Sequence, residues 1–372
     1  KNKILYISLT GMTEPLGHSQ VLEYLIDLSK ENEIYLISFE RNEDINCIQE
    51  IKDITQSSNI NWKFFKYNNS YGLFSSLKQV LDVLFLAKDI IKKNNIKIVH
   101  ARSFIPAFIG VILKSLYRVK LIYDIRGFAI DEKVDRGRLT KNSILFKILK
   151  KIDKYIYKRS DHVVTLTHKS QNILCELFTL NENNISVIPT CANSSIFKLM
   201  KEEEKKVFKK NLGFNEDDII IIHTGTVSGW YDFDKELLLI NELMKKDIRI
   251  KFLILNKNEE NFINKMLKKY KVCKNRVCIR SSDFKDVYKY LNISNYSIFF
   301  IKQSFSKQAS APTKFAENIS CLLPSITNIE VGDMEFYIRN FNVGLLFDLK
   351  NLNYEDSSNE ILKDFDKIYD EK

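Results

Sequence analysis

The sequence predicts an α/β protein built from two domains, each containing a doubly wound parallel β-sheet. Apolar stretches of strand length alternate with longer amphipathic stretches along almost the whole chain. This alternation is typical of parallel strands joined by helical crossovers. A length of 372 residues is also enough for two domains of ordinary size, each with its own core.

The first domain is expected over residues 1–190. Ile4–Leu9 has the continuous apolar pattern of a buried strand, and a loop with two glycines follows it. A helix then begins near Gly17 or His18, and Ile34–Phe39 returns as the second strand. The remaining strands and helices are expected, in chain order, at Asn61–Tyr67, Leu73–Lys93, Ile96–His100, Phe104–Leu116, Val119–Asp124, Asn142–Lys158, His162–Leu166, His168–Phe178 and Ile185–Pro189.

A turn-rich connector around Pro189 leads to the second domain, expected over residues 195–352. Its strands and helices alternate again, at Ile219–His223, Asp234–Met244, Ile248–Leu255, Glu259–Tyr270, Arg276–Ile279, Phe284–Leu291 and Ile298–Ile301. A polar loop then leads to a short helix with Pro312 in its first turn, where the missing N–H has no helical partner to lose. Residues 353–372 are expected to form a last helix, because apolar residues recur there at helical spacing.

Composition narrows the function classes without choosing one. The net charge of +10 indicates an anionic partner, which is nucleic acid, an acidic membrane surface or a phosphorylated substrate. The six cysteines are scattered, without a C-x-x-C pair or a histidine at ligand spacing, so neither a disulfide framework nor a zinc site is expected. No apolar run has the length of a membrane span, and residues 1–9 are typical of a strand rather than a signal peptide. A cytoplasmic location is therefore expected.

The strongest candidate for a binding site lies between residues 302 and 320. A helix start presents free backbone N–H groups, and Lys302, Lys307 and Lys314 add positive charge in front of it. Glu317 lies one turn further along, at a spacing where its carboxylate accepts hydrogen bonds from sugar hydroxyls. The alternative is a solvated basic loop before an ordinary helix, and the local sequence favours neither.

Polar residues also follow the strands of the first domain, where ligands of doubly wound sheets bind. The candidates lie in three places: the loop that contains Gly11 and Gly17, the stretch after the strand that ends at His100, and the charged loop over residues 126–137. They are His18, Arg102, Ser103, Arg126, Asp131 and Glu132. For the charged loop, the alternative is a surface loop that only forms ion pairs. For His18, the alternative is a histidine that donates one hydrogen bond and has no other role.

Four motifs resemble those of the retaining, family-four glycosyltransferases of the GT-B fold. They are G-M-T-E-P-L-G-H-S-Q at 11–20, V-I-P-T-C-A-N at 187–193, H-T-G-T-V-S-G-W-Y at 223–231 and S-A-P-T-K-F-A-E-N-I-S-C-L-L-P-S-I at 310–326. Two positions depart from the family pattern. Ala309 stands where the first of two glutamates is usual, and Leu323 stands where a glycine is usual.

The resemblance implies two Rossmann-like domains that face each other across a cleft, with the last helix crossing back to the first domain. It implies a nucleotide-sugar donor bound by Gly17, Gly225, Thr226, Ser310, Ala311, Pro312, Thr313, Lys314 and Glu317. It places the acceptor beside Arg102, Ser103, Asp131 and Glu132. The residues expected to act in catalysis are His18, Arg126, Lys302 and Lys307.

The expected activity is transfer of a sugar to a cell-surface glycan or a lipid-linked acceptor, with retention of anomeric configuration. No D-x-D motif is placed to bridge a diphosphate, so neither a metal nor another cofactor is expected. UDP, GDP and CMP all remain open as the donor nucleotide. The alternatives are a nucleotide-sugar epimerase of the same architecture and a non-catalytic protein that binds nucleic acid or another anionic ligand.

Two amphipathic, basic segments suggest where the acceptor lies. Residues 144–159 combine an apolar stripe with five lysines, a pattern that favours binding to the anionic inner face of the cytoplasmic membrane. Residues 71–93 are similar but more apolar, which favours a core helix. For residues 144–159 the alternative is an ordinary exposed helix face.

Overall fold

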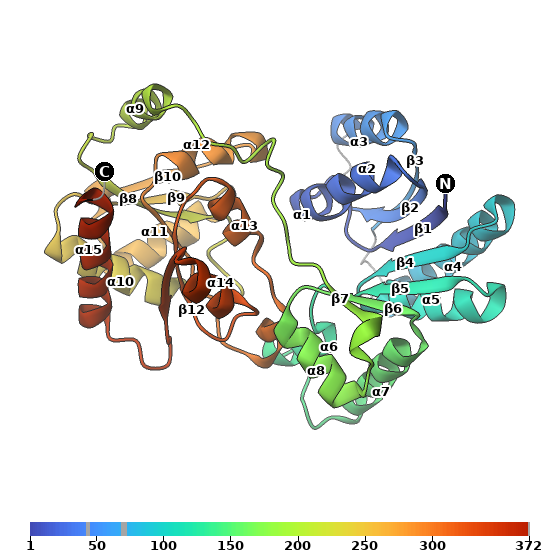
Figure 1. Ribbon diagram of the computed structural model, residues 1–372. Helices are drawn as coiled ribbons and strands as arrows, with labels where there is room; N and C mark the ends of the chain where they lie inside the picture. The colour runs from blue at the N-terminus through green and yellow to red at the C-terminus, as the bar shows by residue number, and fades with distance from the viewer. Residues whose placement is uncertain (42–44, 68–72, 371–372) are drawn as a thin grey trace. The chain divides into compact units, whose positions relative to one another are not determined.

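The computed structural model describes residues 1–41, 45–67 and 73–370 (Figure 1). The chain divides into two compact units, one of residues 1–190 with 308–310, and one of residues 191–307 with 311–372. All strand pairs within the two sheets are parallel. The prediction of two parallel-sheet α/β domains is therefore confirmed.

The sheet of the first unit has seven strands in the order β3-β2-β1-β4-β5-β6-β7. Their bounds are β1 (Lys3–Ser8), β2 (Glu33–Glu40), β3 (Ile60–Lys66), β4 (Ile98–Arg102), β5 (Lys120–Asp124), β6 (His162–Thr165) and β7 (Ile185–Val187). The strand order changes direction between β1 and β4. In doubly wound sheets this switch point, at the carboxyl ends of the strands, is where ligands bind.

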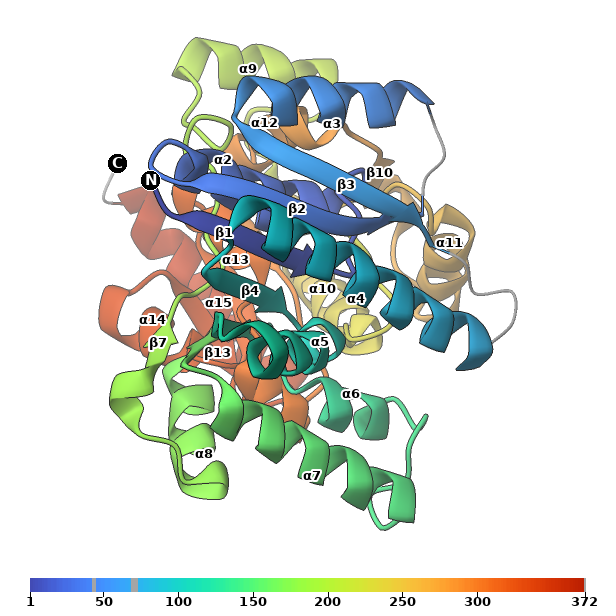
Figure 2. The ribbon, with the colours of Figure 1, turned by 90° about the vertical axis from the view of Figure 1, so that its right-hand side faces the viewer.

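Helices cover both faces of this sheet (Figure 2). They are α1 (Pro15–Gly17), the π-helical turn η1 (His18–Leu22), α2 (Glu23–Ser29), α3 (Ile45–Ser57), α4 (Leu73–Asn94), α5 (Phe104–Tyr117), α6 (Ala129–Asp135), α7 (Ile144–Arg159), α8 (His168–Phe178) and the 3-10 turn η2 (Glu182–Asn184). Buried residues of α2 and α3 pack on one face, and those of α4, α5, α7 and α8 pack on the other.

Two elements of the first unit differ from the sequence prediction. The helix α3 was not predicted, although Ile51 and Thr55 are buried on one side of it. Residues 126–137 were expected to form a loop, but α6 occupies most of this stretch. Asp131 and Glu132 lie in the first turn of α6, where negative charge complements the helix dipole.

The sheet of the second unit has six strands in the order β10-β9-β8-β11-β12-β13. Their bounds are β8 (Ile219–Thr224), β9 (Ile250–Leu255), β10 (Val277–Arg280), β11 (Tyr296–Ile298), β12 (Ser325–Asn328) and β13 (Gly344–Phe347). The switch point of this sheet lies between β8 and β11. It therefore coincides with the two loops that the sequence singles out after these strands.

The helices of the second unit are α9 (Glu202–Asn211), α10 (Phe233–Lys246), α11 (Glu260–Lys269), α12 (Val287–Asn292), α13 (Thr313–Ser320), α14 (Met334–Phe341) and α15 (Tyr354–Asp370). Short 3-10 turns occur at η3 (Lys274–Arg276), η4 (Phe284–Asp286) and η5 (Phe305–Ala309). One apolar core joins the sheet to α10, α11 and α15, and a second core joins its other face to α12 and part of α9.

Residues of α15 belong to this unit, where Ile361 and Phe365 are buried in the core. The expected crossing of this helix to the first domain stays a prediction. The strand β11 ends at Ile298, earlier than predicted. Ile301 instead forms an isolated antiparallel bridge with Tyr231, and this bridge joins the chain after β11 to the loop after β8.

In the described part of the chain, no helix is both long and apolar enough to cross a membrane. The membrane association expected from residues 144–159 would therefore depend on a surface helix. Of the second basic segment, residues 71 and 72 lie outside the described residues, and the remainder forms α4. Val83 and Ala87 of α4 are buried in the core, in agreement with the core alternative.

Candidate functional site

Two segments lie side by side at the switch point of the second sheet. One is the loop after β8, residues 224–232, which we call the glycine loop. The other is the chain that follows β11. The Asp232 N–H donates to the Phe300 carbonyl (2.8 Å), and the Lys302 N–H donates to the Trp230 carbonyl (2.9 Å). The bridge between Tyr231 and Ile301 lies between these two hydrogen bonds. This pairing brings the lysine-bearing segment directly onto the glycine loop.

Three lysine ammonium groups contact three consecutive residues of the glycine loop. Lys302 Nζ donates to the Gly229 carbonyl (2.9 Å), Lys307 Nζ lies 3.5 Å from the centroid of the Trp230 ring, and Lys314 Nζ lies 3.8 Å from the centroid of the Tyr231 ring. Residues 224–232 contain no lysine or arginine of their own. Positive charge at this loop is therefore supplied by the segment that follows β11 and by α13.

A buried polar cluster connects Lys314 to the strand β8. His223 Nδ1 lies 2.7 Å from Glu236 Oε2, and both side chains are fully buried. The other ring nitrogen of His223 lies 3.0 Å from the Thr226 carbonyl and 3.5 Å from Lys314 Nζ. Glu236 also accepts a hydrogen bond from the Phe300 N–H (2.9 Å). This cluster fixes α10, the glycine loop and α13 to one another.

The ionisable groups on α13 have perturbed pKa values. Burial lowers the pKa of Lys314 to about 8, while the carboxyl groups of Glu236, Glu317 and Glu259 oppose this change. Burial raises the pKa of Glu317 to about 7, and the charge of Lys314 opposes that change. Perturbed pKa values at the end of a sheet are typical of functional sites. Glu317 and Lys314 therefore both change charge near neutral pH.

The glycine loop is held in place by Glu259. Its carboxylate accepts hydrogen bonds from the Val227 N–H (2.9 Å) and from Asn256 Nδ2 (2.8 Å). Burial alone would raise the pKa of Glu259, but hydrogen bonds from Ser228, Val227 and Asn256 bring this pKa below its ordinary value. Glu259 was not among the predicted site residues, because its only signal in the sequence is its position just beyond the strand next to β8.

Gly225 and Gly229 adopt positive φ angles of 82° and 71°. This left-handed backbone is easily accessible to glycine, and it turns the loop sharply after β8. The Gly225 N–H donates to the Leu255 carbonyl (2.8 Å), and the Thr226 hydroxyl donates to the Ser228 carbonyl (3.4 Å). Both predicted donor residues of this loop therefore help to shape it.

The start of α13 differs in detail from its prediction. Pro312 occupies the N-cap position and Thr313 is the first helical residue, so the helix begins one residue later than expected. Ala311 directly precedes this N-cap, while Ser310 lies in the short stretch that groups with the first unit. Ala309 belongs to the same stretch and is fully buried in an apolar core. A glutamate at 309 would place an unpaired carboxylate in that core at a high free-energy cost.

The first unit holds its own glycine loop in the same manner. Glu40, at the end of β2, accepts hydrogen bonds from the Met12 N–H (2.9 Å) and the Thr13 N–H (3.0 Å). A side chain at Gly17 would place its Cβ 1.8 Å from the Gly11 carbonyl oxygen, so close backbone packing requires glycine there. This contact accounts for Gly17 without a ligand, and its predicted role in donor binding stays a prediction.

Arg102 and Arg126 come together around Asp124 at the switch point of the first sheet. Arg102 Nη1 lies 3.5 Å from one carboxylate oxygen, and Arg126 Nη1 lies 3.9 Å from the other. Asp124 Oδ1 is buried and has no hydrogen-bond partner among the described residues. Arg126 also donates to Gln20 Oε1 (3.2 Å) and has a φ of 49°, an uncommon backbone conformation for arginine. The structure therefore places these two candidate arginines beside the same carboxylate, and their roles stay predictions.

The other candidates of the first unit are less closely grouped. Ser103 precedes α5 with a φ of 75°, and His18 Nδ1 lies 3.8 Å from Glu23 Oε1. Asp131 accepts a hydrogen bond from Lys150 Nζ (2.9 Å), so its carboxylate already has a cationic partner. Glu132 lies beside it in the first turn of α6. Among the described residues, no group of three or more His, Cys, Asp or Glu side chains is arranged to hold a metal ion.

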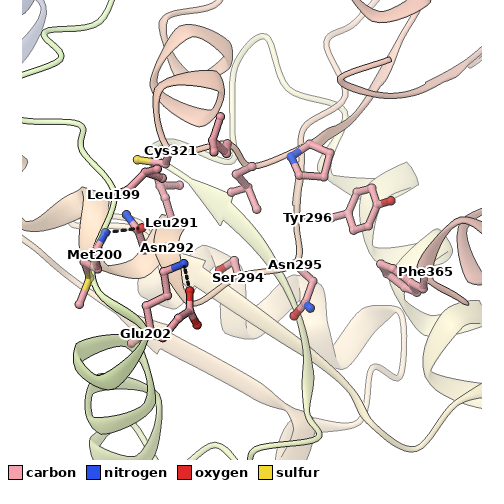
Figure 3. A pocket seen from close by; sticks show the side chains of 14 residues that line it. Leu199, Met200, Glu202, Leu291, Asn292, Ser294, Asn295, Tyr296, Cys321 and Phe365 are labelled. Carbon is pink, nitrogen blue, oxygen red and sulfur yellow. Dashed lines mark hydrogen bonds and ion pairs between the residues drawn. The ribbon is translucent and has the colours of Figure 1, made fainter. Parts of the chain in front are cut away.

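A cavity of about 530 Å³ lies elsewhere in the second unit (Figure 3). It is lined by residues that precede β11 and β12, such as Asn295 and Pro324, so it opens at the amino ends of these strands. Asn292, which lines it, is occupied by hydrogen bonds with the backbone of Met200 and Lys198. The cavity and the glycine loop are therefore at opposite ends of the sheet.

A comparison with protein families matches part of the chain. Residues 62–195 match the family described as Glycosyltransferase Family 4. A comparison with curated proteins finds no match.

Solved structures resemble the whole chain. A glycosyltransferase from Rickettsia africae is 19% identical with a TM-score of 0.70, and the match covers 99% of this chain and 89% of that one. HepE of Anabaena, in complex with UDP-glucose, is 14% identical with a TM-score of 0.70, covering 99% and 90%. WaaG, a glycosyltransferase involved in lipopolysaccharide biosynthesis, is 12% identical with a TM-score of 0.67, covering 97% and 90%.

Proposed function

We propose that this chain is a glycosyltransferase whose donor is a nucleotide-activated sugar bound by the second unit, because the chain has the GT-B fold and its residues 62–195 match glycosyltransferase family 4. The proposed acceptor is a cell-surface glycan or a lipid-linked saccharide, and the proposed outcome is retention of anomeric configuration. One observation carries the donor assignment: three lysines contact the glycine loop at the switch point of the second sheet, and Glu317 follows Lys314 on the same helix.

Each part of this arrangement suits a nucleoside diphosphate. The loop and the start of α13 offer backbone N–H groups, and the lysines offer positive charge, which together favour a phosphate. Glu317 lies one turn beyond Lys314 on α13, where its carboxylate accepts hydrogen bonds from the ribose hydroxyls. The donor site therefore recognises phosphate and ribose through different residues.

The proposed chemistry follows from the charge that develops during transfer. As the bond between the sugar and the phosphate breaks, negative charge grows on the leaving phosphate oxygens. Lysines and N–H groups already oriented towards those oxygens stabilise the transition state more than the ground state. The leaving phosphate then takes the proton of the acceptor hydroxyl, so no protein nucleophile takes part. The reaction is proposed to need no metal, because the lysines supply the positive charge.

We propose that the acceptor binds to the first unit and is carried by a membrane surface. Ile144, Leu145 and Ile148 of α7 are 78%, 56% and 48% exposed, although they are large and apolar. The other side of the same helix contributes Ile156 and Tyr157 to the core. Exposed apolar side chains beside lysines are typical of helices that bind anionic lipid surfaces. We therefore assign the protein to the cytoplasmic face of the membrane, with a lipid-linked acceptor.

The function is tested by mixing the purified chain with UDP-, GDP- and CMP-sugars, with EDTA present, and with vesicles that contain lipid-linked saccharides. We expect one donor to be consumed faster with acceptor vesicles than without, and a product whose anomeric configuration by NMR equals that of the donor. Epimerised donor formed without any acceptor would instead identify an epimerase. An inverted product would contradict retention, and a rate abolished by EDTA would contradict the metal-independent reaction.

A further inference from the structure

Another cavity, of about 450 Å³, lies in the first unit at the amino ends of β5 and β6. The last turns of α5 and α7, which pack on the same face of the sheet, line it together with the links to the next strands (Figure 2). Asp161 is the one carboxylate among the described residues that line this cavity. Five cationic side chains line it as well, and they are Lys114, Arg118, Lys120, Lys158 and Arg159. We call it the basic pocket.

Asp161 fixes two of these cations. Its carboxylate accepts hydrogen bonds from Lys114 Nζ (2.6 Å), Lys120 Nζ (3.2 Å) and the Leu121 N–H (2.8 Å). Burial alone would raise the pKa of Asp161, but the hydrogen bonds from Lys114, Leu121 and Lys120 bring it below its ordinary value. Lys114 also donates to the Arg159 carbonyl (2.8 Å), where α7 ends with a partial negative charge. The negative groups of the pocket therefore already have partners.

The other three cations are not used in this way. Arg118 and Lys158 are exposed, and neither forms an ion pair with a described residue. Arg118 ends α5 with a φ of 54°, a left-handed position at which glycine is most common. The backbone conformation disfavours arginine there, so the local fold does not explain the residue. An arginine side chain at the pocket can instead bind an anion.

The basic pocket lies at one end of the exposed face of α7. Lys158 shares this face with Lys147, Lys151 and Lys154, because the four residues recur at spacings of three and four. The same face is proposed above to contact an anionic membrane. A headgroup phosphate at that surface would therefore meet Lys158 and the pocket beside it.

We propose that the basic pocket binds the phosphate of a lipid headgroup and prefers a phosphate monoester to a diester. It rests on the proposed membrane location, because the membrane supplies the phosphate. A monoester carries a charge of about −1.5 to −2 near pH 7 and offers three acceptor oxygens, whereas a diester carries a single charge. Arg118 supplies the paired donors that suit phosphate oxygens, and Lys158 adds a point charge.

The bound lipid is a membrane component rather than the acceptor. Lys120, in the pocket, begins β5, whereas Asp124 ends the same strand at the switch point of the first sheet. The pocket and the proposed acceptor residues Arg102 and Ser103 are therefore at opposite ends of this sheet. Lipid in the pocket would hold the first unit on the membrane without occupying the acceptor site.

The test compares two double variants of equal net charge. The pocket variant carries Arg118→Gln and Lys158→Gln, and it retains the contacts of Asp161. The control variant carries Lys147→Gln and Lys151→Gln, which are exposed on the same face of α7 but do not line the pocket. Cosedimentation uses vesicles of neutral lipid mixed with phosphatidic acid, a monoester, or with phosphatidylglycerol, a diester, adjusted to the same zeta potential.

The wild type and the control variant should bind the monoester vesicles roughly tenfold more tightly than the diester vesicles, as one additional charge-assisted hydrogen bond predicts. In the pocket variant this ratio should fall to about one. Arg118→Gly should also lower the ratio, while its melting temperature is at least that of the wild type, because glycine adopts a φ of 54° without strain. This combination separates lipid binding from a loss of folding.

A ratio near one in the wild type, or an unchanged ratio in the pocket variant, would overturn the pocket and leave the membrane location standing. Pocket-dependent binding of inorganic phosphate in calorimetry, without a preference among vesicles, would identify a site for free phosphate and overturn the lipid assignment. A wild type that binds no acidic vesicles would refute both the pocket and the membrane location. Nucleotide affinity, measured separately, should be the same in all these variants.

Discussion

Glu317→Ala is expected to weaken binding of the donor nucleotide by roughly 1.5–3 kcal/mol, or about 10- to 150-fold, while the fold is retained. The reason is the loss of charge-assisted hydrogen bonds from the ribose hydroxyls to the carboxylate. Glu317 lies on one short helix outside the sheet, so its truncation leaves the sheet intact. The measurement is titration calorimetry with the preferred nucleoside diphosphate. Glu204→Ala, an exposed glutamate on α9, is the matched control.

The same carboxyl predicts a pH dependence of nucleotide affinity. Since its pKa is raised to about 7, Glu317 is largely protonated at pH 6 and becomes charged as the pH rises through 7. Affinity should therefore increase over this range. It should fall again above about pH 8, because Lys314, with a pKa lowered to about 8, then loses its positive charge. Glu317→Gln should abolish the increase of affinity up to pH 8 and keep the decrease above it. Unchanged nucleotide affinity in Glu317→Ala, or an unchanged pH profile in Glu317→Gln, would remove Glu317 from the donor site.

Replacing Lys147, Lys151 and Lys154 of α7 with glutamine is expected to reduce binding to anionic vesicles by about 3 kcal/mol, or roughly 150-fold. Each of these lysines is exposed, and a lysine near an anionic surface contributes about 1 kcal/mol. Lys150 is left unchanged because it pairs with Asp131 (2.9 Å) inside the unit. Cosedimentation with vesicles of neutral and of acidic lipid measures the effect.

The control replaces three exposed lysines of the second unit, Lys210, Lys265 and Lys268, with glutamine. Both triple variants have the same net charge, so a difference between them reports the position of the lysines rather than their number. Wild-type binding should also weaken as salt rises, because the attraction fades within a Debye length of roughly 8 Å at physiological salt. Equal binding to neutral vesicles, or equal losses in both variants, would show that α7 is an ordinary exposed face.

The fold could be predicted well because it depends on patterns that local sequence displays. Buried parallel strands such as β8, with four consecutive isoleucines, can be recognised from composition alone. One error has a local cause: the helix α6 was mistaken for a loop because two glycines and many charges surround a single short helical stretch. The packing of α15 depends on which core accepts Ile361 and Phe365, and spacing along one helix does not specify that.

The candidate site could be predicted only in part. The alternation of strands and helices was enough to place Lys302, Lys307 and Lys314 at the carboxyl ends of the strands of the second sheet, where the structure has them. Their partners could not be inferred, because the bridge between Tyr231 and Ile301 joins residues far apart in the sequence. The roles of Glu40 and Glu259 were hidden for the same reason, since each accepts hydrogen bonds from a loop that precedes it by about thirty residues. Three-dimensional pairing decides these contacts.

The most direct test of the donor assignment is hydrogen exchange of the wild-type chain with and without a saturating nucleoside diphosphate. Bound ligand slows the exchange of amides that it contacts or orders. The account predicts protection in residues 224–232 and 313–320, at the switch point of the second sheet. Protection confined instead to residues 199–202 and 321–324, which line the cavity at the amino ends of the strands, would contradict it.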